Sequence, residues 1–486
     1  MPKRENPISR VNRPKMKIYL YNLGCARNIV DGEAMQGLLE KTGHTFVEDA
    51  GDAGAIIVNT CSFIEPAAEE SVDAILEMAR LKSEGSCSRL IVTGCLPERY
   101  RENLAAALPE VDAFLGTGAY DRVERALSGE TEKGICLLPD PAAIPLHTRS
   151  TQRARSTHPA CYVKIMEGCN RRCTYCIIPK LRGRLRSRTP EDIGREVRDM
   201  AEQGAPEIVI IGQDTTSYGD DLDGRTNLAD LLALAAKAAP DAWIRFLYGH
   251  PDRIDDRLLE TVRDHPNICP YFDIPVQHVS RAVLKRMGRG GHDRRFLEDL
   301  FSRIRDRVPD AALRTTVMTG FPGETEADFN ELSEFVKTMR FDHLGAFVYS
   351  DADDLVSHRL AGHVPAEVAK DRMERLMTLQ AEISLEKNEA RVGQTHAVLL
   401  EENQHDGTVI GRTMFQAPEV DGITVVYASS TRSPNTAGDT SSEASSETSP
   451  ETSPETSLVD IGDFIGKRIH VTITQATEYD LEGVPA

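Results

Sequence analysis

The sequence has no apolar run long enough to span a bilayer, which predicts a protein without a transmembrane segment. The N-terminus, MPKRENPISR, is basic but has no apolar stretch behind it, so we do not expect a secretory signal peptide. The ten cysteines are spread along a chain of 486 residues rather than concentrated in a short one. This distribution is typical of a reducing cytoplasm, where clustered cysteines more often bind metal or do redox chemistry than form disulfides.

Positive charge is also scarce. The chain carries 57 basic and 76 acidic residues, a formal net charge of −19. Because phosphate contacts supply most of the affinity of nucleic-acid binders, this balance disfavours a general nucleic-acid-binding protein and favours a basic partner. A soluble acidic surface without a charged partner is the simpler alternative. The hydrophobic content of 40% is enough for real cores, and the length suggests about three domains.

The first domain is expected over residues 16–130, where short apolar runs alternate with helical patterns. Strands are predicted at 17–23, 55–59 and 90–93, and helices at 30–43 and 65–82. Strands that alternate with helices favour an α/β domain with a parallel sheet covered on both faces. Residues 128–156 are rich in Pro, Ser, Thr and Arg, which is typical of a linker.

The alternation restarts in a second domain, expected over residues 155–386. Strands are predicted at 162–166, 207–212, 244–248, 271–274, 313–319 and 343–348. A helical pattern follows each strand, at 190–203, 228–238, 255–265, 293–307, 325–339 and 364–390. Six such units are too few for a closed eight-fold barrel. They predict a partial (β/α)6 barrel with its site at the carboxyl ends of the strands.

The tail, residues 388–486, changes character. Short β-like runs such as THAVLLEE, GTVIGRT, GITVVYA and RIHVTITQAT predict a small antiparallel β-barrel. Residues 428–458 interrupt it with an ETSP repeat and almost no apolar side chains. Such a segment cannot bury a core, so we expect a disordered insert.

The strongest chemical signal is CNRRCTYC, which places Cys169, Cys173 and Cys176 just after the first barrel strand. Three thiolates in a CxxxCxxC spacing can hold one face of a cubane iron–sulfur cluster and leave one iron without a protein ligand. An open position on a metal centre is where a substrate or cofactor binds. The alternative is a three-cysteine zinc site, which would lack a nearby fourth ligand.

This spacing at the end of a first barrel strand resembles the radical S-adenosylmethionine (SAM) superfamily. The resemblance implies a [4Fe-4S] cluster on Cys169, Cys173 and Cys176 whose open iron binds SAM, and cleavage of SAM to a 5′-deoxyadenosyl radical. Tyr175 matches the aromatic position beside the cluster in that family. A loop aromatic that packs on the barrel rim is the other interpretation of Tyr175.

A second cysteine signal is spread through the first domain. Cys25, Cys61 and Cys95 each lie just beyond the carboxyl end of a predicted parallel strand. In an open parallel sheet those ends share one edge, where ligands bind. The three cysteines can therefore converge into a second three-thiolate site. Taken singly, each would be an ordinary buried cysteine.

Three such cysteines, a radical SAM barrel and a final small β-barrel together resemble the methylthiotransferases, over residues 16–486. The resemblance implies that the last domain is a TRAM domain. It also implies a second [4Fe-4S] cluster on Cys25, Cys61 and Cys95, which takes part in sulfur delivery. One SAM would supply the methyl group and a second the radical, so that a methylthio group is added to an unactivated carbon. A low-potential electron donor is then required.

Weaker motifs follow the other barrel strands. In radical SAM folds these strand ends contact SAM, so Gln213, Gln277 and Arg314 are candidate SAM-pocket residues. Asp273 and His278 stand in the same FDIPVQHVS motif as Gln277. Further along, Thr325 and Asp328 form a predicted helix-capping pair. Cys87, Cys136, Cys161 and Cys269 match no ligand position and are interpreted as ordinary packing or surface residues.

Two branches of the methylthiotransferases compete. The MiaB branch modifies an adenosine in tRNA, and the RimO branch modifies the β-carbon of an aspartate in the twelfth small-subunit ribosomal protein. This chain reads QDTTSYG, FDIPVQHVS and MGRGGH where the tRNA branch usually reads QNVNSY, HLPVQSGS and MNRGYT. All three differences favour the RimO branch. A non-catalytic iron–sulfur scaffold or electron carrier is the alternative from another class, but carriers usually close each cluster with four protein ligands.

Two local features depart from the RimO pattern. Cys25 lies in GCARN rather than GCPKN, so Ala26 and Arg27 differ from it. Residues 350–358, SDADDLVSH, replace an EGT-like turn that usually follows the Tyr-Ser pair.

The charge of the tail bears on the partner. Residues 388–486 contain 16 acidic and 5 basic residues, a net charge of −11, and the tail without 428–458 still has a net charge of −7. A small barrel that gripped tRNA would need a basic face. The tail should instead attract a lysine- and arginine-rich protein, so a basic small-subunit ribosomal protein is the expected partner and tRNA is not.

The insert yields a first prediction. Deleting residues 430–457 should change the melting temperature and the activity very little, because a polar Ser/Thr/Glu/Pro stretch buries little surface. Differential scanning fluorimetry of the deletion variant beside the full chain measures this. A large loss of melting temperature would show that the segment contributes to the folded structure.

Overall fold

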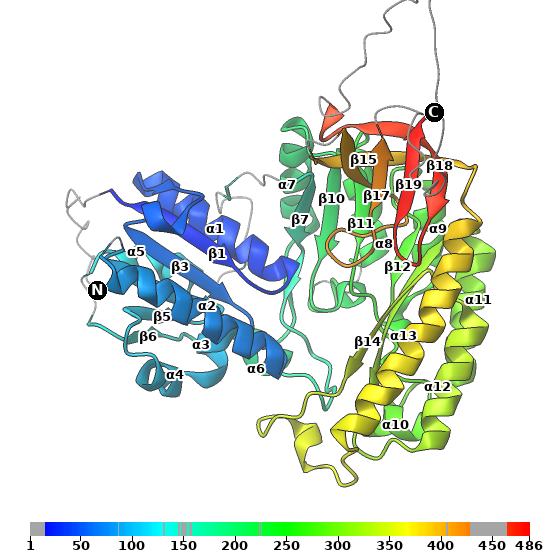
Figure 1. Cartoon of the computed structure of the whole chain (residues 1–486), viewed down its shortest axis with the longest axis horizontal. Helices are drawn as coiled ribbons and strands as arrows, with labels where there is room; N and C mark the ends of the chain where they lie inside the picture. Colours follow the sequence, from blue (N-terminus) through cyan, green and yellow to red (C-terminus); the bar gives the residue numbers. More distant parts are fainter. Residues whose placement is uncertain are drawn as a thin grey trace, which may run out of the picture.

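The computed structural model describes residues 15–85, 87–129, 132–143, 146, 153–154, 158–222, 224, 226–404, 407–427 and 464–486. The segment 428–458, whose composition predicts disorder, lies outside these described residues. Figure 1 shows three parts: an α/β domain in blue and cyan, an open barrel in green and yellow, and a small β-barrel in orange and red. In the part of the chain that is described, no helix is long and apolar enough to cross a membrane.

The N-terminal domain is a six-stranded parallel sheet with the strand order β2-β1-β3-β4-β5-β6. Its strands are β1 (Lys17–Asn22), β2 (Thr45–Phe46), β3 (Ala55–Thr60), β4 (Arg89–Gly94), β5 (Ala113–Leu115) and β6 (Ile135–Leu137). Its helices are α1 (Ala26–Thr42), α2 (Glu65–Ser83), α3 (Cys95–Tyr100), α4 (Glu102–Ala107) and α5 (Val123–Leu127). Helices α1 and α5 pack on one face of the sheet, and α2 and α4 on the other. The predicted covered parallel sheet is confirmed.

The supposed linker at 128–156 contains one more strand of this sheet. Strand β6 pairs with β5, with Ile135 opposite Ala113 and Leu137 opposite Leu115. The linker interpretation is therefore wrong for these residues. A three-residue edge strand is too short for an apolar pattern to reveal it, and only its pairing with β5 identifies it.

The central domain is a barrel of six parallel strands that does not close. Two sheets, β7-β10-β11 and β12-β13-β14, are joined by a parallel bridge between Ile244 and Ile268. The strands are β7 (Ala160–Lys164), β10 (Glu207–Ile211), β11 (Trp243–Phe246), β12 (Tyr271–Asp273), β13 (Ala312–Thr319) and β14 (His343–Val348). The short antiparallel pair β8 (Met166–Glu167) and β9 (Arg186–Ser187) follows β7. The predicted partial (β/α)6 barrel is confirmed.

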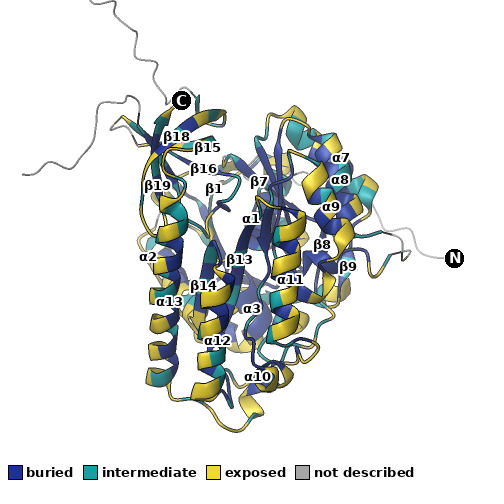
Figure 2. Cartoon of the chain, turned by 90° about the vertical axis from the view of Figure 1, so that its right-hand side faces the viewer, coloured by how far each residue is buried: buried dark blue, intermediate teal, exposed yellow. Residues whose placement is uncertain are grey.

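Helices cover the outer face of this barrel. The short α6 (Ile178–Arg182) instead packs against α3 of the N-terminal domain. The covering helices are α7 (Pro190–Glu202), α8 (Leu228–Ala238), α9 (Asp256–Asp264), α10 (Arg281–Arg286), α11 (Arg294–Arg307), α12 (Glu326–Met339) and α13 (Ala366–Glu389). Six of them begin after a side chain that accepts a hydrogen bond from the first turn: Thr189, Asn227, Asp255, Ser280, Asp293 and Thr325. Thr325 and Asp328 form the predicted capping box. Figure 2 shows these helices buried toward the strands and exposed outside.

The last domain is a closed five-stranded barrel, β15-β16-β17-β19-β18. Its strands are β15 (Thr395–Asn403), β16 (Thr408–Thr413), β17 (Thr424–Tyr427), β18 (Arg468–Ala476) and β19 (Leu481–Pro485). The predicted small barrel is confirmed, with one addition. The unpredicted strand β19 pairs in parallel with β17 and antiparallel with β18, so the barrel is not wholly antiparallel.

The other two domains cover the open inner face of the central barrel. Tyr162, Val209 and Trp243 point inward and pack with Val30 of α1 and Leu399 of β15. An eight-stranded barrel would fill this interior with its own side chains. Here the missing strands are replaced by an α/β domain on one side and the small β-barrel on the other, so the three domains form one structure around the barrel interior.

A buried ion cluster strengthens the contact between the central and C-terminal barrels. Glu207 at the start of β10 accepts hydrogen bonds from Arg245 of β11 and from Arg412 of β16, both at 2.6 Å. Glu207 and Arg245 are fully buried and Arg412 nearly so. Removal of the central carboxylate would leave two buried guanidinium groups without their shared partner.

We therefore predict that Glu207→Gln lowers the free energy of unfolding by about 3–5 kcal/mol. The single tryptophan, Trp243, lies at this contact with Arg468 over its ring, so its fluorescence in a urea titration follows the transition. The control is Glu298→Gln, which breaks a half-exposed helical pair with Arg294 and should cost about 0.5 kcal/mol or less. Equal small losses in both variants would contradict the role of the ion cluster.

Candidate active site

A cavity of about 280 Å³ lies at the carboxyl ends of the central barrel strands. Cys169, Cys173 and Cys176 all line it. So do side chains that directly follow other strands, including Gln213 after β10 and Tyr248 after β11. In parallel barrels this end carries the reacting groups.

The cysteine loop begins with a sharp turn at Gly168. Its φ is +78°, and a Cβ at this position would lie 2.2 Å from the Arg184 carbonyl oxygen, so only glycine fits. Inside the loop, the Arg171 N–H donates to Cys169 Sγ at 3.4 Å. Burial raises the pKa of the Cys169 thiol and raises that of Cys176 to about 12. Without a metal these thiols stay protonated, and a bound metal would be needed to ionise them.

Cys25, Cys61 and Cys95 come together at one edge of the N-terminal sheet. Strands β1, β3 and β4 end in register, since Asn22 pairs with Asn59 and Thr60 with Gly94. Cys25 caps α1, Cys61 directly follows β3, and Cys95 begins α3. The loops approach so closely that a Cβ at Gly24 would lie 2.8 Å from the Cys61 Cβ.

Two arginine side chains lie against these three thiols. Arg182 Nη2 is 3.7 Å from Cys95 Sγ and donates to the Asn28 side-chain oxygen at 2.8 Å. Burial alone would raise the pKa of Cys25, but the guanidinium groups of Arg27 and Arg182 lower it below its ordinary value. Burial raises the pKa of Cys95 to about 11. Burial also raises the pKa of Cys61, so the neighbouring cations favour the metal-binding thiolate form at Cys25 alone.

A buried charge network joins the two groups of cysteines. Lys164 at the end of β7 contacts Asp31 of α1 at 2.6 Å and Glu167 at 2.7 Å. Arg182, six residues after Cys176, contacts the same Asp31 at 2.6 Å. The network therefore fixes α1, which begins after Cys25, against the segment that carries the barrel cysteines.

Arg27 lies between the two groups. Its guanidinium donates to the Gly212 carbonyl oxygen at 2.8 Å and stands 4.6 Å from the Tyr248 ring centroid. It lines the same cavity as Cys176. In the sequence Arg27 stands out only as a difference from GCPKN, and nothing there shows that it reaches the barrel.

The four candidate SAM-pocket residues, Tyr175, Gln213, Gln277 and Arg314, all line the cavity. The Tyr175 hydroxyl accepts a hydrogen bond from Arg289 at 3.2 Å, and its ring meets Phe321 edge-on. Burial raises the pKa of this hydroxyl above its usual range. Tyr175 is thus both a cavity residue and a packed aromatic.

Gln213 and Gln277 both line the cavity and are held there in different ways. The Gln213 side-chain nitrogen donates to Glu167, while its oxygen is buried without a hydrogen-bond partner among the described residues. Gln277 is held in the left-handed region, with φ +69°, by backbone hydrogen bonds to Thr316 and Met318 at 2.8 Å. Gln213 therefore offers a free acceptor to a polar ligand in the cavity.

Arg314 is held by two carboxylates from different domains. Asp273 contacts it at 3.0 Å, and Asp421, from the loop between β16 and β17, contacts it at 3.3 Å. The Tyr271 hydroxyl also donates to Asp421, at 2.6 Å. The C-terminal barrel therefore contributes a buried carboxylate that touches a cavity residue, a contact that the sequence does not reveal.

Other residues singled out in the sequence lie away from the cavity. His278 is fully buried and accepts a hydrogen bond from the Ser280 N–H at 3.0 Å. Burial lowers its pKa to about 4, so it is neutral. The remaining cysteines, Cys87, Cys136, Cys161 and Cys269, are not among the residues that line the cavity in the described chain.

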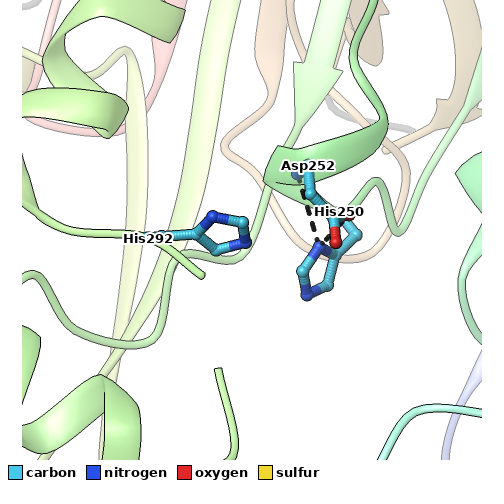
Figure 3. A group of neighbouring side chains, drawn as sticks. All are labelled: His250, Asp252 and His292. Atoms are coloured by element: carbon cyan, nitrogen blue, oxygen red, sulfur yellow. Dashed lines mark hydrogen bonds and ion pairs between the residues drawn. The ribbon is translucent and has the colours of Figure 1, made fainter. Parts of the chain in front are cut away.

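One polar group was missed by sequence reasoning. Figure 3 shows His250 joined to Asp252, with the His292 ring approaching from another segment. Histidine and carboxylate side chains can hold a metal, but both Asp252 oxygens already accept from Arg171, at 2.8 and 2.9 Å. Burial lowers the pKa of His250 to about 4, so its neutral ring donates to Asp252. We interpret the group as a hydrogen-bonded support for His250, which lines the cavity. His250 follows β11 as Gln213 follows β10, a signal that could have found it.

Three family models match the chain. They are the radical SAM superfamily over residues 163–336, the uncharacterized protein family UPF0004 over 17–116, and the TRAM domain over 392–442. The match to the first covers the cysteine loop and five of the six barrel strands in full or in part. The TRAM match covers the first strands of the C-terminal barrel.

A solved structure shares the fold. The radical SAM methyltransferase TsrM from Kitasatospora setae aligns with a TM-score of 0.51 and 14% identity, over 68% of this chain and 72% of that chain.

Relatives that align over most of the chain establish its family. The ribosomal protein uS12 methylthiotransferase RimO of Desulfosudis oleivorans is 48% identical over 96% of this chain and 99% of its own length. RimO of Clostridioides difficile is 41% identical over 96% and 98%, and that of Anaeromyxobacter sp. strain K is 45% identical over 84% and 87%. Since this identity extends through all three domains, the chain belongs to the RimO family of radical SAM methylthiotransferases.

Proposed function

We propose that this protein adds a methylthio group to the β-carbon of an aspartate in ribosomal protein uS12. The observation that carries the proposal is that Cys169, Cys173 and Cys176 line the cavity, and that Arg27, two residues after Cys25, lines it too. Cys25, Cys61 and Cys95 meet at the adjoining edge of the N-terminal sheet. The names of the whole-length relatives agree with it, and they do not favour the tRNA-modifying branch. A reaction on a ribosomal protein would take place in the cytoplasm.

Each group of cysteines would hold one [4Fe-4S] cluster. Cys169, Cys173 and Cys176 share one cavity wall, and Cys25, Cys61 and Cys95 share one sheet edge. Three thiols each, without a fourth cysteine alongside, fit clusters with one open iron. When bound, the clusters and SAM supply the electron, the sulfur, the methyl group and the hydrogen-abstracting radical. A low-potential electron donor is the remaining partner.

The chain's own side chains would bind and orient SAM. Tyr175 and Gln277 border the barrel cysteines, and the buried Gln213 oxygen can accept a hydrogen bond from an ammonium or hydroxyl group. Arg314 would keep its orientation because Asp273 and Asp421 hold it from both sides.

The C-terminal barrel would receive the ribosomal protein. Its net charge without 428–458 is −7, which repels phosphate and attracts a basic protein. Asp421 connects this barrel directly to Arg314 in the cavity. A partner that binds the barrel would therefore lie next to the reaction site.

The cluster assignment is tested by iron content. Anaerobically reconstituted protein should hold about eight irons per chain. Replacing Cys169, Cys173 and Cys176 together by Ala should halve the iron and abolish SAM cleavage. Replacing Cys25, Cys61 and Cys95 should halve the iron and leave some SAM cleavage. The matched control is the double variant Cys136→Ser and Cys161→Ser, which should keep all the iron; full iron in the second triple variant would exclude the N-terminal cluster.

The substrate assignment is tested by mass spectrometry. With SAM and a reductant, the enzyme should add a methylthio group to the aspartate-bearing loop peptide of uS12 and none to tRNA adenosine. The Cys169, Cys173 and Cys176 triple variant serves as the inactive control. Incorporation into tRNA, or tight tRNA binding at physiological salt, would assign the protein to the tRNA-modifying branch instead.

A further inference from the structure

Residues 349–360 follow β14 and include the segment SDADDLVSH, where the chain departs from the usual EGT-like turn. They leave the central barrel and reach the N-terminal domain. The Glu65 N–H at the start of α2 donates to Ser350 Oγ at 3.3 Å. The segment therefore spans the boundary between the two domains that carry the cysteines.

Asp354 is the polar centre of this segment. Its two oxygens accept a forked pair of hydrogen bonds from Arg99, at 2.7 and 3.1 Å. Lys180, four residues after Cys176, contacts the same carboxylate at 3.1 Å. Arg99 lies in α3, four residues after Cys95. One carboxylate thus links the helix behind an N-terminal cysteine to the helix behind a barrel cysteine.

Arg99 extends this link to a second N-terminal cysteine. Its third nitrogen donates to the Ser62 carbonyl oxygen at 2.6 Å, and Ser62 directly follows Cys61. The Arg99 side chain is only 4% exposed, so these bonds are formed out of water. A forked arginine–carboxylate pair fixes direction as well as distance.

Further contacts hold the same segment to the barrel cysteine loop. The Ser357 N–H donates to the carbonyl oxygen of Thr174, which lies between Cys173 and Cys176, at 3.0 Å. Leu355 is buried and packs with Cys95, Ile177 and Leu181. The segment therefore contacts supports of both cysteine groups at once, by polar and apolar contacts.

We propose that residues 349–360 form a clasp that fixes the two cysteine groups relative to each other, with Asp354 as its positioning residue. The inference rests on the proposed function, because the distance matters only if both groups hold clusters. Transfer between two centres requires close geometry, and a misplacement of about 1 Å can cost about a hundredfold in rate. Asp354 acts through Arg99 and Lys180 and touches no reacting atom.

The test compares three variants with the wild-type enzyme. Asp354→Asn removes the charge at the centre of the clasp. Asp353→Asn, one residue away in the same segment and exposed, removes the same charge but leaves the carboxylate that Arg99 and Lys180 contact. Asp354→Glu keeps the carboxylate and should restore much of the function. Arg99→Lys keeps the cation but loses the fork, so it tests the same contact if Asp354→Asn does not fold.

Asp354→Asn should keep about eight irons and cleave SAM at a rate within about twofold of wild type, while product formed per SAM cleaved falls by about tenfold or more. The magnetic coupling between the two reduced clusters in electron paramagnetic resonance should weaken. In the metal-free protein, the Ser357 amide should exchange faster with deuterium, because its partner Thr174 is no longer held in place. Asp353→Asn should match wild type in all of these measurements.

The outcomes separate the two proposals. If wild-type protein holds one cluster or gives no methylthiolated peptide, the proposed function fails. If wild type performs as expected and Asp354→Asn matches it in product ratio, cluster coupling and Ser357 exchange, the clasp is wrong. If Asp353→Asn lowers the product ratio equally, surface charge rather than the clasp determines it.

Discussion

The buried charge network of Asp31, Lys164, Glu167 and Arg182 is the interaction on which the rest of the site depends. It places two carboxylates and two cations out of water, an arrangement that is stable only while every member keeps its partner. Asp31 belongs to the helix that begins after Cys25, and Arg182 to the one that follows Cys176. Two cysteine groups far apart in sequence are held close together because separating this network would leave buried charges without partners, at a large cost in free energy.

The central barrel is open, and this explains why the three domains pack together into one structure. Six strands leave an inner face that the barrel cannot fill alone, so α1 and the C-terminal barrel cover it. This covering brings Arg27 beside Tyr248 on one side and Asp421 beside Arg314 on the other. The cavity is therefore lined by the N-terminal and central domains, and the C-terminal barrel contacts one of its side chains, Arg314, through Asp421.

Much of this arrangement could be predicted from local sequence. The strands and helices of the first two domains have strong apolar periodicity, and both cysteine groups follow strand ends, where parallel topology brings residues together. The edge strand β6 and the barrel strand β19 were missed, because they are short and are identified only by their pairing with neighbours. The roles of Arg27 and Asp354 were also hidden, since each depends on a partner more than 180 residues away in the chain.

The proposed reaction requires two clusters, each with one open iron, on either side of Arg27. Anomalous diffraction at the iron edge, from crystals of reconstituted protein grown without oxygen, would locate them. We expect two iron peaks, one beside Cys25, Cys61 and Cys95 and one beside Cys169, Cys173 and Cys176, with Arg27 between them. A single peak, or a second peak away from the edge where β1, β3 and β4 end, would contradict it.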